Sequence, residues 1–141
     1  MHRLRLLSLL VCCTVPAAIA AAPLAVNWSS NIFTKDNYRS MSVRGAKASF
    51  PSSNSEVEVV DFDLTVFSGD AARKIETVIR APAATFLPRQ NLARGETGVR
   101  LIRDDLEASG VHWTYDHAQK KVSLTGRVQI VFNAEFKNLL K

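Results

Sequence analysis

The C-terminal part of the chain carries a side-chain alternation that few structures can satisfy. In residues 111–132, apolar side chains recur at every second position on both sides of a polar run, residues 116–120. The apolar series consists of Val111, Trp113, Tyr115, Val122, Leu124, Val128, Ile130 and Phe132, with Gly126 in one inward place. Because successive side chains leave opposite faces of a strand, this spacing predicts two half-buried strands around a short turn. The segment is therefore expected to form an antiparallel hairpin.

A second alternation, in residues 57–66, changes register partway. Val57 and Val59 alternate with glutamates. From Val60 and Phe62 onward, the apolar residues alternate with aspartates and a threonine. A shift by one residue would turn the inward face of a strand outward unless the strand contains an extra residue. We therefore predict a β-bulge near Val59 and Val60.

Shorter alternating segments fill most of the remaining chain. They are residues 75–81, which Pro82 is expected to end or offset, and residues 83–87, 99–102 and 106–108. Residues 89–98 have the composition of a loop, and Asp104 and Asp105 that of a turn. The total of about eight short strands, at spacings of roughly ten residues, predicts a single all-β domain built as a sandwich, barrel or roll.

The N-terminus has the composition of a secretory signal peptide. Basic residues precede an apolar run, and Ala18 and Ala20 fit the small-x-small pattern of a cleavage site. We predict that residues 1–20 are a signal peptide that exports the rest of the protein from the cytoplasm. The alternative is an uncleaved membrane anchor, because no charged residue occurs between Arg5 and Lys35 and about 20 apolar residues span a bilayer.

The residues that follow the signal segment, 21–49, are polar and lack a sustained period. We predict an extended leader there, with a first edge strand around residues 41–43, and place the β domain in residues 50–141. Both cysteines, Cys12 and Cys13, lie inside the signal segment. After cleavage the exported part would contain no disulfide and no cysteine-based metal or redox site.

The chain is mildly basic. Its formal net charge is +5, and removal of the signal segment with Arg3 and Arg5 lowers it to +3. That charge is too small and too scattered for a nucleic-acid-binding module. It suits contact with anionic glycans or lipid headgroups.

Three short motifs follow one another in the second half of the chain. An alanine-bearing strand (Arg-Ala-Pro-Ala-Ala-Thr-Phe) occupies residues 80–86, a tyrosine-acid turn (Trp-Thr-Tyr-Asp) residues 113–116, and a Leu-x-Gly-x-Val-x-Ile strand residues 124–130. In this order, over residues 56–132, the chain resembles the LptC and LptA (OstA-like) periplasmic proteins of lipopolysaccharide transport. A cleavable N-terminus is similar to LptA, whereas one compact domain behind a polar leader is similar to LptC. The choice between the two stays open.

The resemblance implies a single-domain open β-jellyroll that is not an enzyme and needs no metal or cofactor. Members of the family bind lipopolysaccharide with its lipid chains inside the fold. They join edge to edge into a bridge from the inner membrane to the outer membrane. The implied partners are lipopolysaccharide, other β-jellyroll transport proteins that pair through edge strands, and an inner-membrane transporter complex if the N-terminus is an anchor. The implied location is the periplasm.

The inward apolar positions would then line a lipid groove. The candidate groove residues are Val60, Phe62, Leu64, Val66, Ile79, Phe86, Trp113, Tyr115, Leu124, Val128 and Ile130. Four arginines are candidates to contact lipid phosphates, namely Arg80, Arg100, Arg103 and Arg127. Plain core packing and solvated surface arginines are the competing interpretations of the same residues.

Two other function classes compete with lipid transport. An exported β-sandwich that binds carbohydrate or protein would show the same alternation around an interior closed to ligand. An enzyme would need catalytic groups, and the candidates are a zinc site at His112, Asp116 and His117 or a carboxylate pair at Asp61 and Asp63. We expect a solvated turn and a solvent-facing strand at these positions, because the sequence contains no recognisable catalytic motif.

Overall fold

The computed structural model describes residues 22–51 and 55–133. They form one all-β domain of eight antiparallel strands with a short 3-10 turn, η1 (Pro88–Gln90). The strands are β1 (Leu24–Phe33), β2 (Arg39–Ser49), β3 (Val57–Phe67), β4 (Ile75–Leu87), β5 (Leu92–Gly95), β6 (Val99–Ile102), β7 (Leu106–Asp116) and β8 (Lys121–Phe132). The predicted all-β fold class and the C-terminal hairpin are confirmed. The predicted signal segment, with Cys12 and Cys13, lies outside the described residues.

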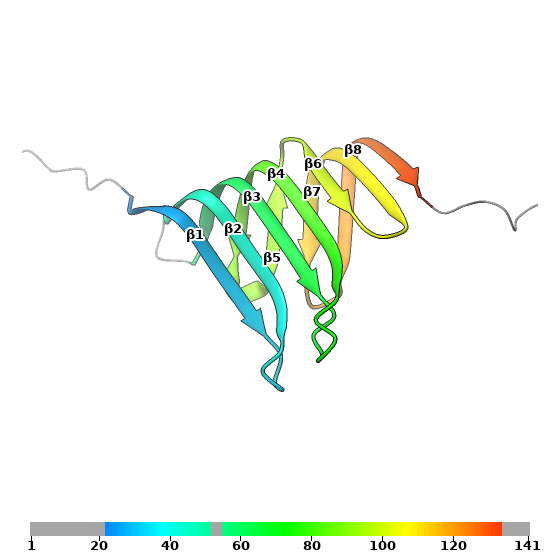
Figure 1. The fold of residues 1–141 in the computed structure, drawn as a ribbon. Helices are drawn as coiled ribbons and strands as arrows, with labels where there is room; N and C mark the ends of the chain where they lie inside the picture. The colour runs from blue at the N-terminus through cyan, green and yellow to red at the C-terminus, as the bar shows by residue number, and fades with distance from the viewer. Residues whose placement is uncertain (1–21, 52–54, 134–141) are drawn as a thin grey trace, which may run out of the picture.

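The strands follow one another as a meander (Figure 1). β1, β2, β3 and β4 pair in chain order, β7 pairs with β8, and β5 and β6 both lie between β4 and β7. β5 pairs with the end of β7 and β6 with its start, so the two act as one long strand interrupted at residues 96–98. Among the described residues, β1 and β8 each have a partner strand on one side only. They form the two edges of the sheet.

A crease crosses the sheet where cross-strand pairing is interrupted at the same level in successive strands. Asn27, Ala46, Asp61 and Pro82 occupy this level in β1 to β4, and the register next to it is unchanged on both sides. Asn27 and Asp61 have φ angles of 52° and 54°, and His112 in β7 has 54°. Because a left-handed residue bends a strand sharply, the whole sheet folds along the crease (Figure 1).

The fold produces two leaves that pack face to face. The first leaf consists of residues 28–33, 39–45, 62–67, 75–81, 99–102, 106–111 and 128–132, and the second of residues 24–26, 47–49, 57–60, 83–87, 92–95, 113–116 and 121–126. The ring centroids of Phe62 in the first leaf and Trp113 in the second lie 5.7 Å apart. Those of Trp28 and Phe86 lie 6.2 Å apart. The strands of each pair are not neighbours in the sheet, so these contacts join the leaves and build the core of a two-layered, jellyroll-like fold.

The register change predicted in β3 is part of the crease. Val59 and Phe62 are buried, whereas the two residues between them, Val60 and Asp61, are exposed. The extra residue therefore lies where the alternation predicted it. The neighbouring strands are interrupted at the same level, so pairing continues without a register shift there. All the strands therefore bend together at the crease, whereas an isolated bulge would bend one strand alone.

Pro82 does not end its strand. β4 continues through it to Leu87, so the separate strand predicted for residues 83–87 is the second half of β4. Pro82 is exposed and faces Asp61 at the crease, where β3 and β4 form no ladder pair. A proline at that level removes no ladder hydrogen bond, which is why the strand tolerates it.

Two segments predicted to be irregular belong to the sheet. The predicted leader, residues 21–49, contains β1 and β2, which corrects the predicted domain boundary at residue 50. Met41 and Val43 of β2 are fully buried. The predicted loop, residues 89–98, contains β5, whose Ala93 is fully buried. Several inward places in these strands hold serine, alanine or glycine, and such small side chains hide the period of two.

Candidate functional site

A hollow of about 570 Å³ opens between the free ends of the two leaves, on the side away from the crease. We call it the mouth. Its wall consists of Val66, Thr77, Leu101, Leu106, Tyr115 and Val122, and its rim of Lys74, Glu76, Arg103, Asp104, Asp105 and Lys120. Three ion pairs balance the rim, namely Lys74–Asp104 at 3.3 Å, Arg103–Asp105 at 3.6 Å and Lys120–Glu76 at 3.2 Å. The mouth therefore has a mainly apolar wall behind a charged but balanced rim.

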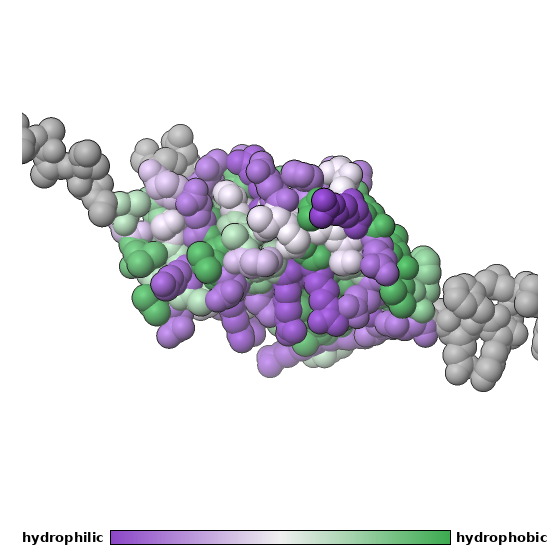
Figure 2. All heavy atoms as spheres, turned by 90° about the horizontal axis from the view of Figure 1, so that it is seen from above, coloured by the Kyte–Doolittle hydropathy of each residue, from purple (hydrophilic) through white to green (hydrophobic). Residues whose placement is uncertain are grey.

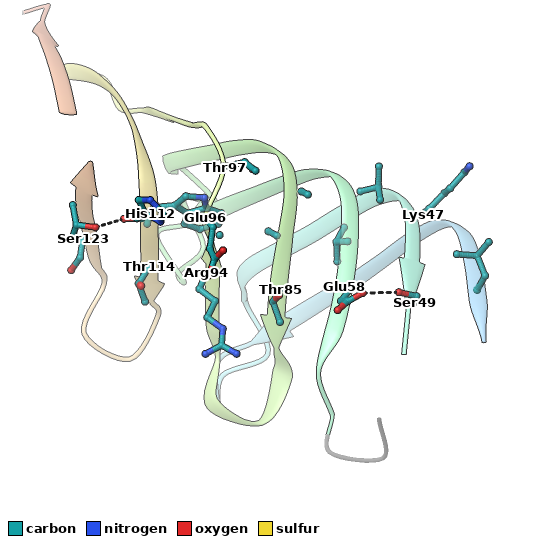
Figure 3. Close-up of a pocket in the computed structure, with 18 residues that line it drawn as sticks. Lys47, Ser49, Glu58, Thr85, Arg94, Glu96, Thr97, His112, Thr114 and Ser123 are labelled. Carbon is teal, nitrogen blue, oxygen red and sulfur yellow. Dashed lines mark hydrogen bonds between the residues drawn. The ribbon is translucent and has the colours of Figure 1, made fainter. Parts of the chain in front are cut away.

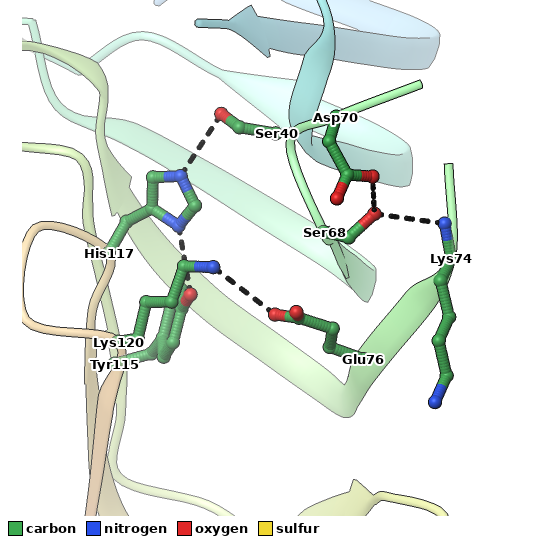
Figure 4. Close-up of polar contacts among 8 residues, drawn as sticks. All are labelled: Ser40, Ser68, Asp70, Lys74, Glu76, Tyr115, His117 and Lys120. Atoms are coloured by element: carbon green, nitrogen blue, oxygen red, sulfur yellow. Dashed lines mark hydrogen bonds and ion pairs between the residues drawn. The ribbon is translucent and has the colours of Figure 1, made fainter. Parts of the chain in front are cut away.

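One turn ties the two leaves together across the mouth (Figure 4). This turn, residues 117–120, joins β7 to β8 at the free end of the second leaf. Lys120 Nζ lies 3.2 Å from Glu76 Oε2, and His117 Nε2 lies 3.1 Å from Ser40 Oγ. Both partners belong to the first leaf. We call the turn and these two contacts the clasp.

The hydrogen bonds around His117 fit a neutral imidazole. Ser40 Oγ donates to the backbone oxygen of Ile32 at 3.3 Å, so it accepts from Nε2–H of His117. The other ring nitrogen, Nδ1, then accepts from the Tyr115 hydroxyl at 2.9 Å. Because the serine hydroxyl donates to a carbonyl and not to the imidazole, this chain of hydrogen bonds does not activate a serine nucleophile.

The surroundings of His117 favour the same neutral state. Burial lowers the pKa of His117, and the positive charge of Lys120 lowers it further, while Asp116 acts in the opposite direction. Burial also raises the pKa of the Tyr115 hydroxyl, with additional contributions from nearby carboxylates. His117 and Tyr115 are therefore both held uncharged, and His117 is not the solvated turn residue that the sequence predicted.

The inward face of β8 continues past the packed core without a covering layer. Ile130 pairs with Ala108 and Phe132 with Leu106, and residues directly opposite on paired strands share a face of the sheet. Ala108 is buried in the core, yet Val128, Ile130 and Phe132 are 46%, 49% and 57% exposed. Figure 2 shows hydrophobic surface gathered toward the two ends of the sheet, at β1 and at β8. At the β8 end, the interior face is therefore open to a ligand or a partner.

The structure divides the predicted groove residues into three groups. The buried group, which packs between the leaves, consists of Phe62, Leu64, Val66, Ile79, Phe86, Trp113 and Tyr115, with Leu124 half-buried against it. Val128 and Ile130 lie on the uncovered inward face of β8. Val60 is 47% exposed and points outward, which corrects its predicted inward position. The cause is the extra residue at Asp61, which leaves Val60 on the outer face.

The four predicted phosphate-contacting arginines are not gathered at the mouth. Arg80 forms an ion pair with Asp63 at 2.9 Å and Arg100 with Glu107, on the outer face of the first leaf. Arg127 is exposed in β8, one residue before the uncovered apolar series. Arg103 borders the mouth. Of the four candidates, only Arg103 therefore lies beside the mouth, because the folding of the sheet places the others elsewhere on its surface.

The predicted metal and acid-base residues are separated in space. His117 belongs to the clasp, whereas His112 lines a second hollow on the outer face of the second leaf. Asp63 of the predicted carboxylate pair is bound by Arg80. Within residues 22–51 and 55–133 no three histidine, cysteine or acidic side chains lie close enough together to hold a metal ion.

The second hollow, about 860 Å³ in volume, runs across the strands of the second leaf (Figure 3). We call it the trough. Ser49 pairs with Glu58, Glu58 with Thr85 and Thr85 with Arg94, so these side chains form one row across four strands. Thr114, Ser123 and Thr125 extend the polar lining toward β8. Sequence reasoning missed the trough, because alternating serine and threonine on an outward face is typical of any solvated strand.

No protein-family model matches the chain, and no curated protein matches it either. In the part of the chain that the structure describes, no helix is long and apolar enough to cross a membrane.

Proposed function

We propose that the protein is a periplasmic component of lipopolysaccharide export that holds lipid chains between its leaves and passes the lipid along an edge-to-edge bridge toward the outer membrane. The observation that carries the proposal is the inward face of β8. There, Val128, Ile130 and Phe132 continue the apolar lining of the core but are about half exposed. The order of motifs that resembles LptC and LptA supports the same function.

Acyl chains are suited to this surface, because each methylene withdrawn from water contributes about 0.8 kcal/mol. The centre of the interior is already filled, since the rings of Phe62 and Trp113 lie 5.7 Å apart. Lipid would therefore occupy the mouth and the adjoining face of β8. The mouth, at about 570 Å³, is within the size range of small-ligand sites.

The two edge strands support the bridge. β1 spans 10 residues and β8 spans 12, and within the described residues each has one side without a partner strand. An unpaired edge can accept a strand of another protein through main-chain hydrogen bonds. Leu24, Val26 and Phe33 add exposed apolar side chains along β1. A neighbouring jellyroll at each edge would extend the inner face beyond a single molecule.

Site-specific photocrosslinking in cells tests the lipid-binding part of this proposal. A crosslinking residue at Ile130, on the inward face, is expected to form an adduct with lipopolysaccharide. The matched control is Val131, which is similarly exposed at 54% but points to the opposite face. Equal adducts from both positions, or adducts from neither, would contradict the proposal.

Carbohydrate binding is a second candidate function, and the trough is the observation that favours it. Thr85, Thr114 and Ser123 place hydroxyls in this hollow, and a hydroxyl both donates and accepts, as a sugar does. Titration calorimetry with a set of neutral and acidic oligosaccharides tests the candidate, with Thr114→Val as the variant expected to weaken binding. Absence of heat with every sugar would reject it.

A further inference from the structure

We propose that the clasp is a gate, which must open before a lipid chain can occupy the mouth. The inference rests on the proposed lipid-binding function and adds regulation of the same site. Lys120 and Tyr115 both line the mouth, and Lys120 reaches across it to Glu76. The ion pair thus lies where a chain would pass between the free ends of the leaves (Figure 4).

The clasp joins the leaves through weak contacts. Its Lys120 and Glu76 side chains are 52% and 39% exposed, and exposed ion pairs contribute little to stability. Its other contact is a single hydrogen bond between His117 and Ser40. The core behind it depends on fully packed rings such as Phe62 and Trp113. The free ends can therefore separate at the clasp while the core and the crease stay intact.

A third hydrogen bond indicates which contacts break. The backbone N–H of His117 donates to the backbone oxygen of Asn91 at 3.0 Å, and Asn91 directly precedes β5 in the second leaf. This bond holds the turn to its own leaf. Opening therefore breaks the contacts to Ser40 and Glu76, which belong to the first leaf, and the turn moves away together with the free end of the second leaf.

Two charge-removing variants test the gate, Lys120→Met and Glu76→Gln. The protein is purified as cells export it, and its association with a fluorescent fatty acid and with lipopolysaccharide is followed by stopped-flow fluorescence. We expect association about two- to fivefold faster in both variants, the range that loss of one exposed ion pair allows. The matched control is Lys74→Met, because the Lys74–Asp104 pair lies on the same rim but within the first leaf. It should leave the rate unchanged.

A reversible lock provides the converse test. Glu76→Cys and Lys120→Cys are introduced together with Cys12→Ser and Cys13→Ser, and the new thiols are joined by a cleavable bis-maleimide. The locked protein should bind both probes at least about tenfold more slowly, and cleavage of the linker should restore the rate.

The outcomes separate the gate from the function that it serves. If the wild type binds the probes but neither the charge variants nor the lock changes the rate, the gate is rejected and lipid binding stands. If the wild type binds neither probe and Ile130 gives no adduct in cells, both proposals are rejected.

Discussion

The centre and the β8 end of the interior are built from the same alternation, but they differ in what lies opposite. At the centre, Phe62 of the first leaf meets Trp113 of the second. At the β8 end, Ile130 lies on the same inward face as the buried Ala108, and no layer covers it to the same extent. A period of two thus specifies which side chains face inward. Whether they become core or an exposed apolar surface depends on whether the other leaf covers them.

The largest expected effect comes from removing the ring at the centre. Trp113→Ala should lower the free energy of unfolding by about 3–5 kcal/mol, because it leaves a cavity in a packed region. Ile130→Ala, at the open end, should change it by only about 0.5 kcal/mol. Urea unfolding followed by circular dichroism measures both. Similar losses in the two variants would show that the β8 end is covered in solution.

Adding a methyl group, instead of removing a side chain, should also distinguish packed from open regions by its effect on stability. An added Cβ at Gly95 would lie 2.5 Å from Trp113 Nε1, so Gly95→Ala should destabilise the protein by about 1–3 kcal/mol. Gly98 has no atom of the described residues within 4 Å of such a Cβ, and Gly98→Ala should be neutral. Thermal unfolding of the two variants makes the comparison. A neutral Gly95→Ala would mean that the indole can move and that the centre is looser than the structure indicates.

The crease determines which residues are brought to the centre at all. Asp61 has a φ of 54°, a conformation that costs a β-branched residue about 1–2 kcal/mol more than glycine. Asp61→Val should therefore be less stable than Asp61→Gly by that amount, and Asp61→Gly should be at least as stable as the wild type. Chemical denaturation of this pair tests the crease. Equal stability of the valine and glycine variants would argue against a left-handed residue at this position.

The smallest effect is expected at the clasp, and it depends on pH. The folded pKa of His117 is below its ordinary value of 6.5, so the unfolded chain binds more protons near that pH. Stability should therefore fall as the pH drops from about 7.5 through 6.5, and level off below the folded pKa. His117→Gln should lose this component. Urea midpoints measured across the range provide the test, and an identical pH dependence in the variant would contradict a half-buried, neutral His117.

The sequence by itself determined which residues of the later strands face inward. Trp113 and Tyr115 of the hairpin are buried as their alternation predicted, and so are Phe62, Leu64 and Val66 of β3. The register change near Val59 and Val60 was also visible, although the alternation counted Val60 in the inward series and the structure places it outside. These features are local. Each depends on the pleat of a single strand, which the order of residues fixes.

Only the tertiary structure decided what those faces meet. β1 and β2 join the sheet although their sequence predicts a leader, because they pair with the regular strand β3 and its neighbours. The clasp joins Ser40 to His117 across 77 positions of the chain. The fold of the sheet at the crease brings these distant residues together. Such contacts cannot be predicted from the alternation of side chains, because they arise from packing between the leaves and not from the geometry of one strand.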